Sequence, residues 1–132
     1  MTDSIGLYGS GLDESRQEAA LLGGEVPVAV YGLGKMGLPL AGVYADLTGN
    51  VVGADVDPEV VESVTRGACH VDGEPGLAEL VDRTVSEGAL RAVDDPTAAA
   101  EDARLHVVIV PTLITDDGRP DLTVVESVVE DI

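Results

Sequence analysis

Short apolar runs alternate with stretches of helical periodicity along the chain from residue 26 onward. The first run, VPVAVY at residues 26–31, is apolar at every position, which is typical of a parallel strand covered on both faces. Later apolar runs predict strands at residues 51–55, 90–93 and 105–110. Apolar residues at helical spacing predict helices at residues 35–47, 58–64, 77–86, 97–102 and 121–129. This alternation predicts an α/β fold in which helices flank a parallel sheet.

Two details sharpen the prediction. In the helix at residues 35–47, apolar residues recur at spacings of three and four, and the expected buried stripe is Leu40, Ala41, Tyr44 and Leu47. Residues 1–24 have a different pattern, with glycines around a single predicted helix at residues 13–22. We therefore expect residues 1–24 to be an appendage and residues 25–132 to form the domain.

The charge balance narrows the possible partners. The chain has 25 Asp and Glu residues against 7 Lys and Arg residues, which gives a net charge of -18. A nucleic-acid partner is not expected, because its phosphates would be repelled. Self-repulsion also destabilises a compact chain in dilute buffer, whereas at molar salt the screening length falls to ~3 Å. Two interpretations stay open: a halophilic protein from a salt-rich cytosol, and an ordinary acidic soluble protein.

Further features indicate the cytoplasm. Cys69 is the only cysteine, so an internal disulfide is excluded and a reducing compartment is expected. No apolar run approaches the ~20 residues of a membrane span. Acidic residues also occur where a signal peptide would be apolar. We expect a cytoplasmic protein with no membrane partner.

Three glycines follow the first predicted strand. Gly32, Gly34 and Gly37 form GLGKMG, a G-x-G-x-x-G pattern that opens a predicted helix. In such a turn the first glycine permits a tight bend, the second lets the backbone approach a pyrophosphate, and the third lets the helix pack closely on the sheet. The free N–H groups and the helix dipole then face the anion. The pattern predicts a dinucleotide-binding turn; the alternative is a set of purely structural glycines.

An acidic residue at the end of the second predicted strand supports the prediction of a dinucleotide-binding turn. Asp55 lies there and is expected to accept hydrogen bonds from the adenosine ribose. Its charge disfavours the extra phosphate of NADP, and no arginine follows within ten residues, so NAD is the expected cofactor. Asp57 competes for this role, but its place before Pro58 suits a helix cap better. Lys35, the only lysine, either helps to hold phosphate or is exposed without a role.

Four sequence blocks then carry a family resemblance over about residues 26–132: VYGLGKMGLPLAGVYA, VVGADVDPEVV, EPGLAEL and VIVPTLITDDGRPDL. Their GLP, EPGL and VPT segments are not general features of Rossmann folds. The chain resembles the UDP-glucose and GDP-mannose dehydrogenase family. The VPT segment with the following I-x-D-x-x-x-P-D-L is most similar to the branch that acts on UDP-N-acetyl-hexosamines such as UDP-N-acetyl-mannosamine.

This resemblance implies an enzyme that oxidises the C6 alcohol of a nucleotide sugar to a carboxylate in two NAD-dependent steps, through a cysteine-bound thiohemiacetal and thioester. It implies that Asp55 binds the ribose and that two groups of residues contact the cofactor. Expected at the pyrophosphate, beside the three glycines, are Leu33, Lys35 and Met36. Expected along the cofactor crevice are Val110, Pro111 and Thr112. Leu113 and Lys35 depart from the family pattern, which commonly has proline and an aromatic residue there.

No catalytic residue is expected within the chain. The resemblance implies a nucleophilic cysteine, with its lysine and asparagine, far downstream of the matched blocks. Cys69 does not match that motif, and Asp72 and Glu74 deny it the electropositive setting of a reactive thiol, so a loop or partly buried thiol is expected. His70 and His106 are expected to be structural, since neither has a second ligand at metal spacing.

The predicted strands number four, whereas a complete doubly wound dinucleotide-binding domain has six. We therefore expect a truncated Rossmann-type sheet, the first half of such a domain, which binds NAD weakly and does not turn over. In the full-length enzyme the expected partners are NAD and a nucleotide-sugar substrate, within a homo-oligomer. Two alternatives stay open: a regulatory NAD-sensing module of the potassium-channel type, which has no reason to carry EPGL and VPT, and a structural remnant that no longer binds ligand.

Overall fold

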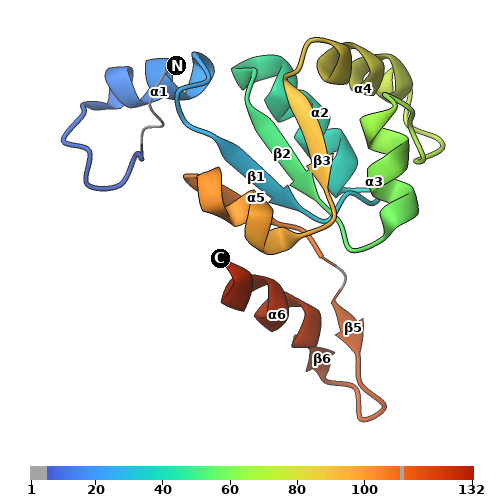
Figure 1. The fold of residues 1–132 in the computed structure, drawn as a ribbon. Helices are drawn as coiled ribbons and strands as arrows, with labels where there is room; N and C mark the ends of the chain where they lie inside the picture. Colours follow the sequence, from blue (N-terminus) through green and yellow to red (C-terminus); the bar gives the residue numbers. More distant parts are fainter. Residues whose placement is uncertain (1–5, 111) are drawn as a thin grey trace.

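The centre of the molecule is a four-stranded parallel sheet with the order β3-β2-β1-β4 (Figure 1). The computed structural model describes residues 6–110 and 112–132. The strands are β1 (Val28–Tyr31), β2 (Val51–Ala54), β3 (Leu90–Val93) and β4 (Leu105–Val108). The chain runs outward from β1 to β3 and then returns to place β4 on the other side of β1, so the strand order reverses between β1 and β4. This is Rossmann topology, and the expected fold class is confirmed.

Helices cover both faces of this sheet (Figure 1). On one face lie α2 (Gly37–Thr48), α3 (Pro58–Thr65) and α4 (Leu77–Ser86), and on the other lie α5 (Pro96–Asp102) and α6 (Thr123–Asp131). Successive strand residues point to opposite faces. Val28 and Val30 of β1 accordingly pack with the first group of helices, whereas Ala29 and Tyr31 pack with the second.

The segment before the sheet forms α1 (Glu14–Leu22), close to the helix predicted there. Its N-cap is Asp13, whose side chain accepts a hydrogen bond from the backbone N–H of Arg16. Ala20 is buried, and Leu21 packs against the core on the α2 side of the sheet.

Several element boundaries follow from backbone hydrogen bonding. The first strand begins at Val28 rather than Val26 because Pro27 has no N–H to donate; the Pro27 carbonyl instead accepts from the N–H groups of Arg104 and Leu105. Residues 58–65, 77–86 and 90–93 form their elements closely as predicted. β4 ends at Val108 rather than Val110, although the N–H of Ile109 still donates to the Tyr31 carbonyl.

The expected buried stripe of α2 is wrong at Leu47, whose side chain is 57% exposed. The residues that this helix buries are Gly37, Leu38, Ala41, Gly42, Ala45 and Thr48. Apart from Leu38 these are small residues, which let the helix lie close to its neighbours; at Gly42 the neighbour is Leu80 of α4. Leu47 instead borders a separate apolar cavity of about 260 Å³ between α1, α2 and β4.

A short antiparallel hairpin was not predicted. It consists of β5 (Leu113–Ile114) and β6 (Pro120–Asp121), which raises the number of strands among the described residues from the expected four to six. Strands of two residues are too short to produce a periodic pattern, so only the Asp-Gly turn at Gly118 signals them. Asp121 pairs within the hairpin and accepts from the backbone N–H of Thr123, and for this reason α6 begins at Thr123 rather than at residue 121.

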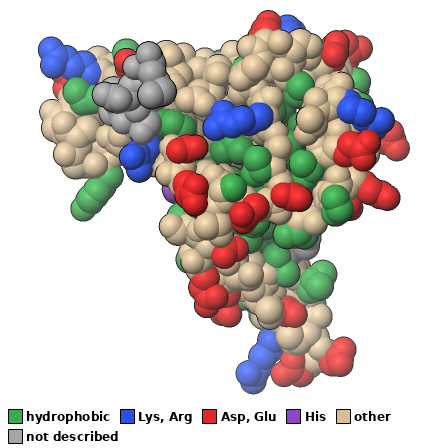
Figure 2. Space-filling model, in the orientation of Figure 1, with side chains coloured by type: hydrophobic (Ala, Val, Ile, Leu, Met, Phe, Trp, Pro, Cys, Tyr) green, Lys and Arg blue, Asp and Glu red, His purple; other side chains and the backbone are tan. Residues whose placement is uncertain are grey.

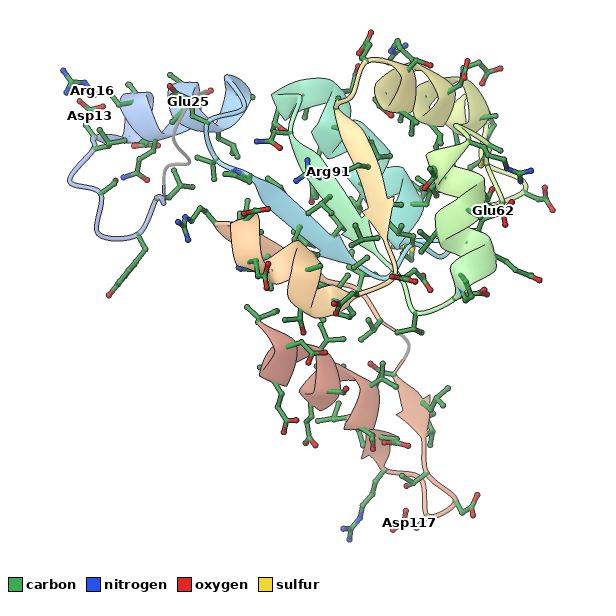
Figure 3. All side chains as sticks on the ribbon, in the orientation of Figure 1. Asp13, Arg16, Glu25, Glu62, Arg91 and Asp117 are labelled. Carbon is green, nitrogen blue, oxygen red and sulfur yellow. The ribbon has the colours of Figure 1, made fainter. Side chains whose placement is uncertain are left out.

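The sequence is strongly acidic, and Figure 2 shows groups of Asp and Glu side chains spread over the visible face, with fewer Lys and Arg side chains among them. Asp117 lies at the far tip of the hairpin, remote from the sheet (Figure 3). Within residues 6–110 and 112–132, no helix has the length and apolar character needed to cross a membrane.

Candidate dinucleotide-binding site

A crevice opens at the carboxyl ends of β1, β2 and β4, where the strand order reverses. Open α/β sheets bind their ligands at this point. Its main space is a cavity of about 400 Å³, lined by Gly32, Gly34, Lys35, Met36, Gly37, Asp55, Val56, Ile109 and Val110. A narrower space of about 90 Å³ adjoins it, lined by Tyr31, Gly32, Ala54, Asp55, Val56, Pro96, Val110, Val124 and Val128. The main space is bordered by the backbone of the turn at residues 32–37 and by Asp55, whereas the narrower space forms an apolar slot.

Gly32 and Gly37 are required by the fold. Gly32 has φ +101°, and a Cβ atom there would lie 2.0 Å from the Ile109 carbonyl oxygen. A Cβ atom at Gly37 would lie 1.7 Å from the Gly32 carbonyl oxygen, so α2 can start this close to β1 only with glycine there. Both contacts are with backbone, which cannot move aside as a side chain can.

Gly34 is not required in this way. Its φ lies outside the left-handed region, and a Cβ atom added there meets no atom of the described residues within 4 Å. The N–H groups of Gly34, Lys35 and Met36 have no acceptor among residues 6–110 and 112–132. The middle of the turn therefore presents free donors and an open space beside them, which is what an approaching pyrophosphate needs.

Leu33 is fixed within the protein. Its N–H donates to Asp55 Oδ2 at 2.9 Å, and its carbonyl oxygen lies 2.6 Å from His70 Nε2. Its side chain is fully buried over Gly53, where a Cβ atom would lie 2.7 Å from Leu33 Cδ2. The N–H of Leu33 thus donates to Asp55 and is not one of the free donors of the turn. The free donors begin one residue later than the sequence suggested.

Asp55 lies between the turn and the crevice. Besides the Leu33 contact, its Oδ1 accepts from the backbone N–H of Asp57 at 3.0 Å. An ionised carboxylate offers about four acceptor positions, so two remain for a ligand. Asp57 caps α3, as predicted, by accepting from the N–H of Glu59 at 3.0 Å. These contacts fix the direction of the Asp55 carboxylate.

Of the remaining predicted site residues, some line the crevice and others do not. Lys35 and Met36 are exposed at the crevice, and no carboxylate of the described residues lies within ion-pair distance of Lys35. Val110 lines both spaces, whereas Thr112 is exposed and lines neither. Pro111 lies outside the described residues.

Several lining residues were missed by the sequence analysis. Val124 and Val128 of α6 close the apolar slot, and Pro96 of α5 joins them. The spacing of four residues between Val124 and Val128 does predict that both lie on one face of a helix. Nothing in the sequence, however, indicates that this face returns to the crevice.

Tyr31 lines the slot and contacts His106 of β4. The Tyr31 hydroxyl lies 2.8 Å from His106 Nδ1, and the two rings stack with centroids 5.8 Å apart. Burial raises the pKa of Tyr31 and lowers the pKa of His106. Both shifts favour the neutral pair, in which the hydroxyl and the ring nitrogen share one hydrogen bond.

Cys69 and the EPGL segment lie away from the crevice. Cys69 is partly buried, as expected, and its thiol donates to the Val71 carbonyl at 3.1 Å. Residues 74–77 line a cavity of about 320 Å³ together with Pro39 of the GLP segment, so two of the sequence blocks meet between α2 and α4. Among the described residues, no group of three His, Cys, Asp or Glu side chains could hold a metal ion.

Fold and crevice together define a Rossmann-type dinucleotide-binding domain. A sequence model of the NAD binding domain of the UDP-glucose/GDP-mannose dehydrogenase family matches residues 26–132. The chain belongs to this family, and NAD is the cofactor of this domain. The resemblance seen in the sequence blocks is thereby confirmed.

Individual relatives agree with this assignment. The chain is 42% identical over 105 residues to UDP-N-acetyl-D-mannosamine dehydrogenase of Yersinia pestis, which covers 80% of this chain and 24% of that protein. It is 38% identical over 100 residues to NDP-N-acetyl-D-galactosaminuronic acid dehydrogenase of Ralstonia nicotianae, which covers 76% of this chain and 22% of that protein.

Solved structures show the same fold. A ternary complex of GDP-mannose dehydrogenase from Pseudomonas aeruginosa matches with a TM-score of 0.76 and 27% identity, over 81% of this chain and 24% of that one. UDP-glucose dehydrogenase from Pyrobaculum islandicum matches with a TM-score of 0.76 and 34% identity, over 80% of this chain and 24% of that one. The chain thus spans about a quarter of the length of these relatives.

Proposed function

We propose that the chain binds NAD in the crevice, with the pyrophosphate against the turn at residues 32–37 and the adenosine ribose at Asp55. The free N–H groups of Gly34, Lys35 and Met36 would hold the phosphates, and the Lys35 ammonium would add a charge. The family resemblance implies that Val110, Pro111 and Thr112 would also contact the cofactor, and of these Val110 lines both spaces of the crevice.

The observation that carries this proposal is the contrast among the three glycines. The fold needs Gly32 and Gly37, because a Cβ atom at either would collide with backbone, but it does not need Gly34. A glycine that nothing in the protein requires, beside unpaired donors, fits a ligand that comes close to the backbone.

At the level of the whole enzyme, we propose that the chain is the NAD-binding portion of a nucleotide-sugar 6-dehydrogenase that oxidises the C6 alcohol of a UDP-sugar to a carboxylate. NAD supplies the hydride acceptor for that chemistry. The two relatives that act on N-acetylated sugars support the UDP-N-acetyl-hexosamine branch. Residues 1–132 alone would bind NAD without turnover, since none of them matches the nucleophilic cysteine or the lysine that the family resemblance implies.

We further propose a cytoplasmic homo-oligomer without a membrane or nucleic-acid partner, in which residues 1–24 are an appendage to the domain at residues 25–132. The net charge of -18 supports a halophilic setting for it.

The test is a titration of NAD against the 132-residue chain while the melting temperature is followed. A ligand that binds only the folded state raises this temperature, so the wild-type chain should show a rise that saturates with NAD. Gly34→Ala should melt at the wild-type temperature or a few degrees above it without ligand, because the added methyl group meets no other atom and such changes stabilise by about 0.4–1 kcal/mol. Its NAD-dependent rise should be lost or greatly reduced.

Gly37→Ala is the matched control, since the same methyl group collides with the Gly32 carbonyl. It should lower the melting temperature before any ligand is added. If NAD leaves the melting temperature of the wild-type chain unchanged, or if Gly34→Ala responds to NAD like wild type, the proposed binding mode is wrong. NADH formation by this chain with any UDP-sugar would contradict the proposed absence of turnover.

A further inference from the structure

His70 carries an unusual feature for a residue that the sequence predicted to be structural. Its Nδ1 is the buried side-chain nitrogen or oxygen without a hydrogen-bond partner within residues 6–110 and 112–132. Buried polar atoms in proteins are nearly always paired, so an unpaired one calls for an explanation. The other ring nitrogen, Nε2, lies 2.6 Å from the carbonyl oxygen of Leu33 in the glycine-rich turn.

The hydrogen-bond partner fixes the tautomer of the ring. A carbonyl oxygen can only accept, so Nε2 carries the proton and donates it to Leu33. Nδ1 is then left with a lone pair that no donor of the described residues reaches. The hydrogen bond to the Leu33 carbonyl is thus the one polar contact of the His70 ring among the described residues.

The Leu33 carbonyl shares a peptide plane with the N–H of Gly34. In a trans peptide these two groups point in opposite directions, and the described part of the chain has no cis peptide bond. Because the carbonyl is held toward His70, the N–H of Gly34 is directed away from the imidazole. Gly34 lines the crevice, and its N–H has no acceptor among the described residues.

The other contacts of Leu33 leave this peptide free to turn. Asp55 holds the N–H of Leu33, which belongs to the preceding peptide, and the pocket over Gly53 holds the side chain. Neither restrains the Leu33–Gly34 peptide, and glycine on its far side permits a wide range of φ. A flipped peptide would present a carbonyl oxygen, instead of an N–H, to an anion.

We propose that His70 is a positioning residue of the cofactor site, which orients the Gly34 N–H toward the pyrophosphate by holding the Leu33 carbonyl. This inference rests on the proposed binding of NAD. His70 belongs to the connection between α3 and α4. This connection contacts the turn through the Leu33 carbonyl, and none of its residues lines the crevice.

The experiment compares three variants of the 132-residue chain by calorimetric titration with NAD and by melting temperature. His70→Phe keeps the ring and removes the donor, and its Kd for NAD should rise at least tenfold. His70→Gln keeps a donor at a similar reach, and its Kd should stay within about threefold of wild type. Cys69→Ala changes the adjacent residue of the same connection and should leave the Kd unchanged. A purely structural role would lower the melting temperature in His70→Phe without changing the Kd of the folded protein.

A second measurement needs neither NAD nor a variant. The ¹⁵N chemical shifts of the wild-type imidazole should report the tautomer protonated at Nε2, with a slowly exchanging proton. The proposal is wrong if the ring is protonated at Nδ1 instead, or if His70→Phe binds NAD as tightly as wild type. If the wild-type chain does not bind NAD, the proposed function is wrong, but the positioning role can still be tested. In that case the tautomer of His70 must be the one protonated at Nε2, and the exchange rate of the Gly34 amide must differ between His70→Phe and wild type. If His70→Phe does not fold, the wild-type tautomer and the affinity of His70→Gln decide it.

Discussion

Single residues of the turn divide into those that shape it and those that face outward. Gly32, Gly37 and Leu33 shape it, because their backbone or side chain is in tight contact with the rest of the protein. Gly34 faces outward without any contact that explains its identity. The sequence pattern gives these glycines equal weight, and only the surroundings of each one distinguish structure from binding.

Asp55 combines both roles, so its substitution tests them together. In Asp55→Asn the amide nitrogen must face either the Leu33 or the Asp57 N–H, which leaves one donor without an acceptor. The free energy of unfolding should fall by about 1–3 kcal/mol. The Kd for NAD should rise roughly tenfold or more, since a charge-assisted hydrogen bond is lost, while the preference for NAD over NADP should narrow.

Urea unfolding and calorimetric titrations with NAD and NADP measure these effects. Asp57→Asn is the control, because asparagine caps a helix about as well as aspartate and Asp57 contacts Asp55 only through its backbone. If Asp55→Asn keeps the wild-type ratio of NAD to NADP affinity, the proposed contact between Asp55 and the ribose is wrong.

At the scale of elements, the sequence predicts the sheet and its helices well and the peripheral pieces poorly. The helix at residues 77–86 and the strand at residues 90–93 have the predicted bounds, because capping residues and turns delimit them. The hairpin of β5 and β6 is too short for any periodicity, and the buried face of α2 includes small residues that a search for large apolar ones overlooks. Of the candidate site, the turn and Asp55 follow from local pattern. The slot formed by Val124 and Val128 depends on a long-range contact that no local pattern encodes.

The contact of β1 with β4 predicts a dependence of stability on pH. Burial lowers the pKa of His106, so the unfolded chain takes up a proton at a higher pH than the folded chain does. Stability from the Tyr31–His106 pair is therefore fully present above the unfolded value of about 6.5 and is lost as the pH falls below it. The melting temperature should decline between pH 7.5 and pH 5.5.

His106→Asn separates this effect from that of the many carboxylates. Asparagine can still accept from the Tyr31 hydroxyl but cannot be protonated, so the decline over the same pH range should be smaller. Equal declines in the two proteins would show that the pair does not contribute.

Taken as a whole, the molecule is dominated by its charge. The net charge of -18 belongs to a chain of 132 residues, and groups of carboxylates are spread over the face seen in Figure 2. Such a surface is unfavourable at low ionic strength and is screened at molar salt, where the Debye length is ~3 Å. The ion pairs among the described residues are few and exposed, and contribute little to offset the repulsion.

We expect the melting temperature to rise by on the order of 10 °C between 0.1 M and 2 M KCl, which corresponds to a few kcal/mol for a domain of this size. A variant with Glu87, Glu101 and Glu130 changed to Gln removes three exposed charges and should be less salt-dependent. Equal stability of the wild-type chain at both salt concentrations would rule out the halophilic interpretation.

Gly53 has a consequence beyond its own strand. Its missing side chain leaves the recess in which the Leu33 methyl groups sit, and that recess determines how deeply the loop settles onto the sheet. Positions 33 and 53 therefore share one fixed volume. Over evolutionary time a larger residue at position 53 therefore requires a smaller one at position 33, whereas glycine at position 53 leaves no room to compensate for a residue larger than leucine at position 33.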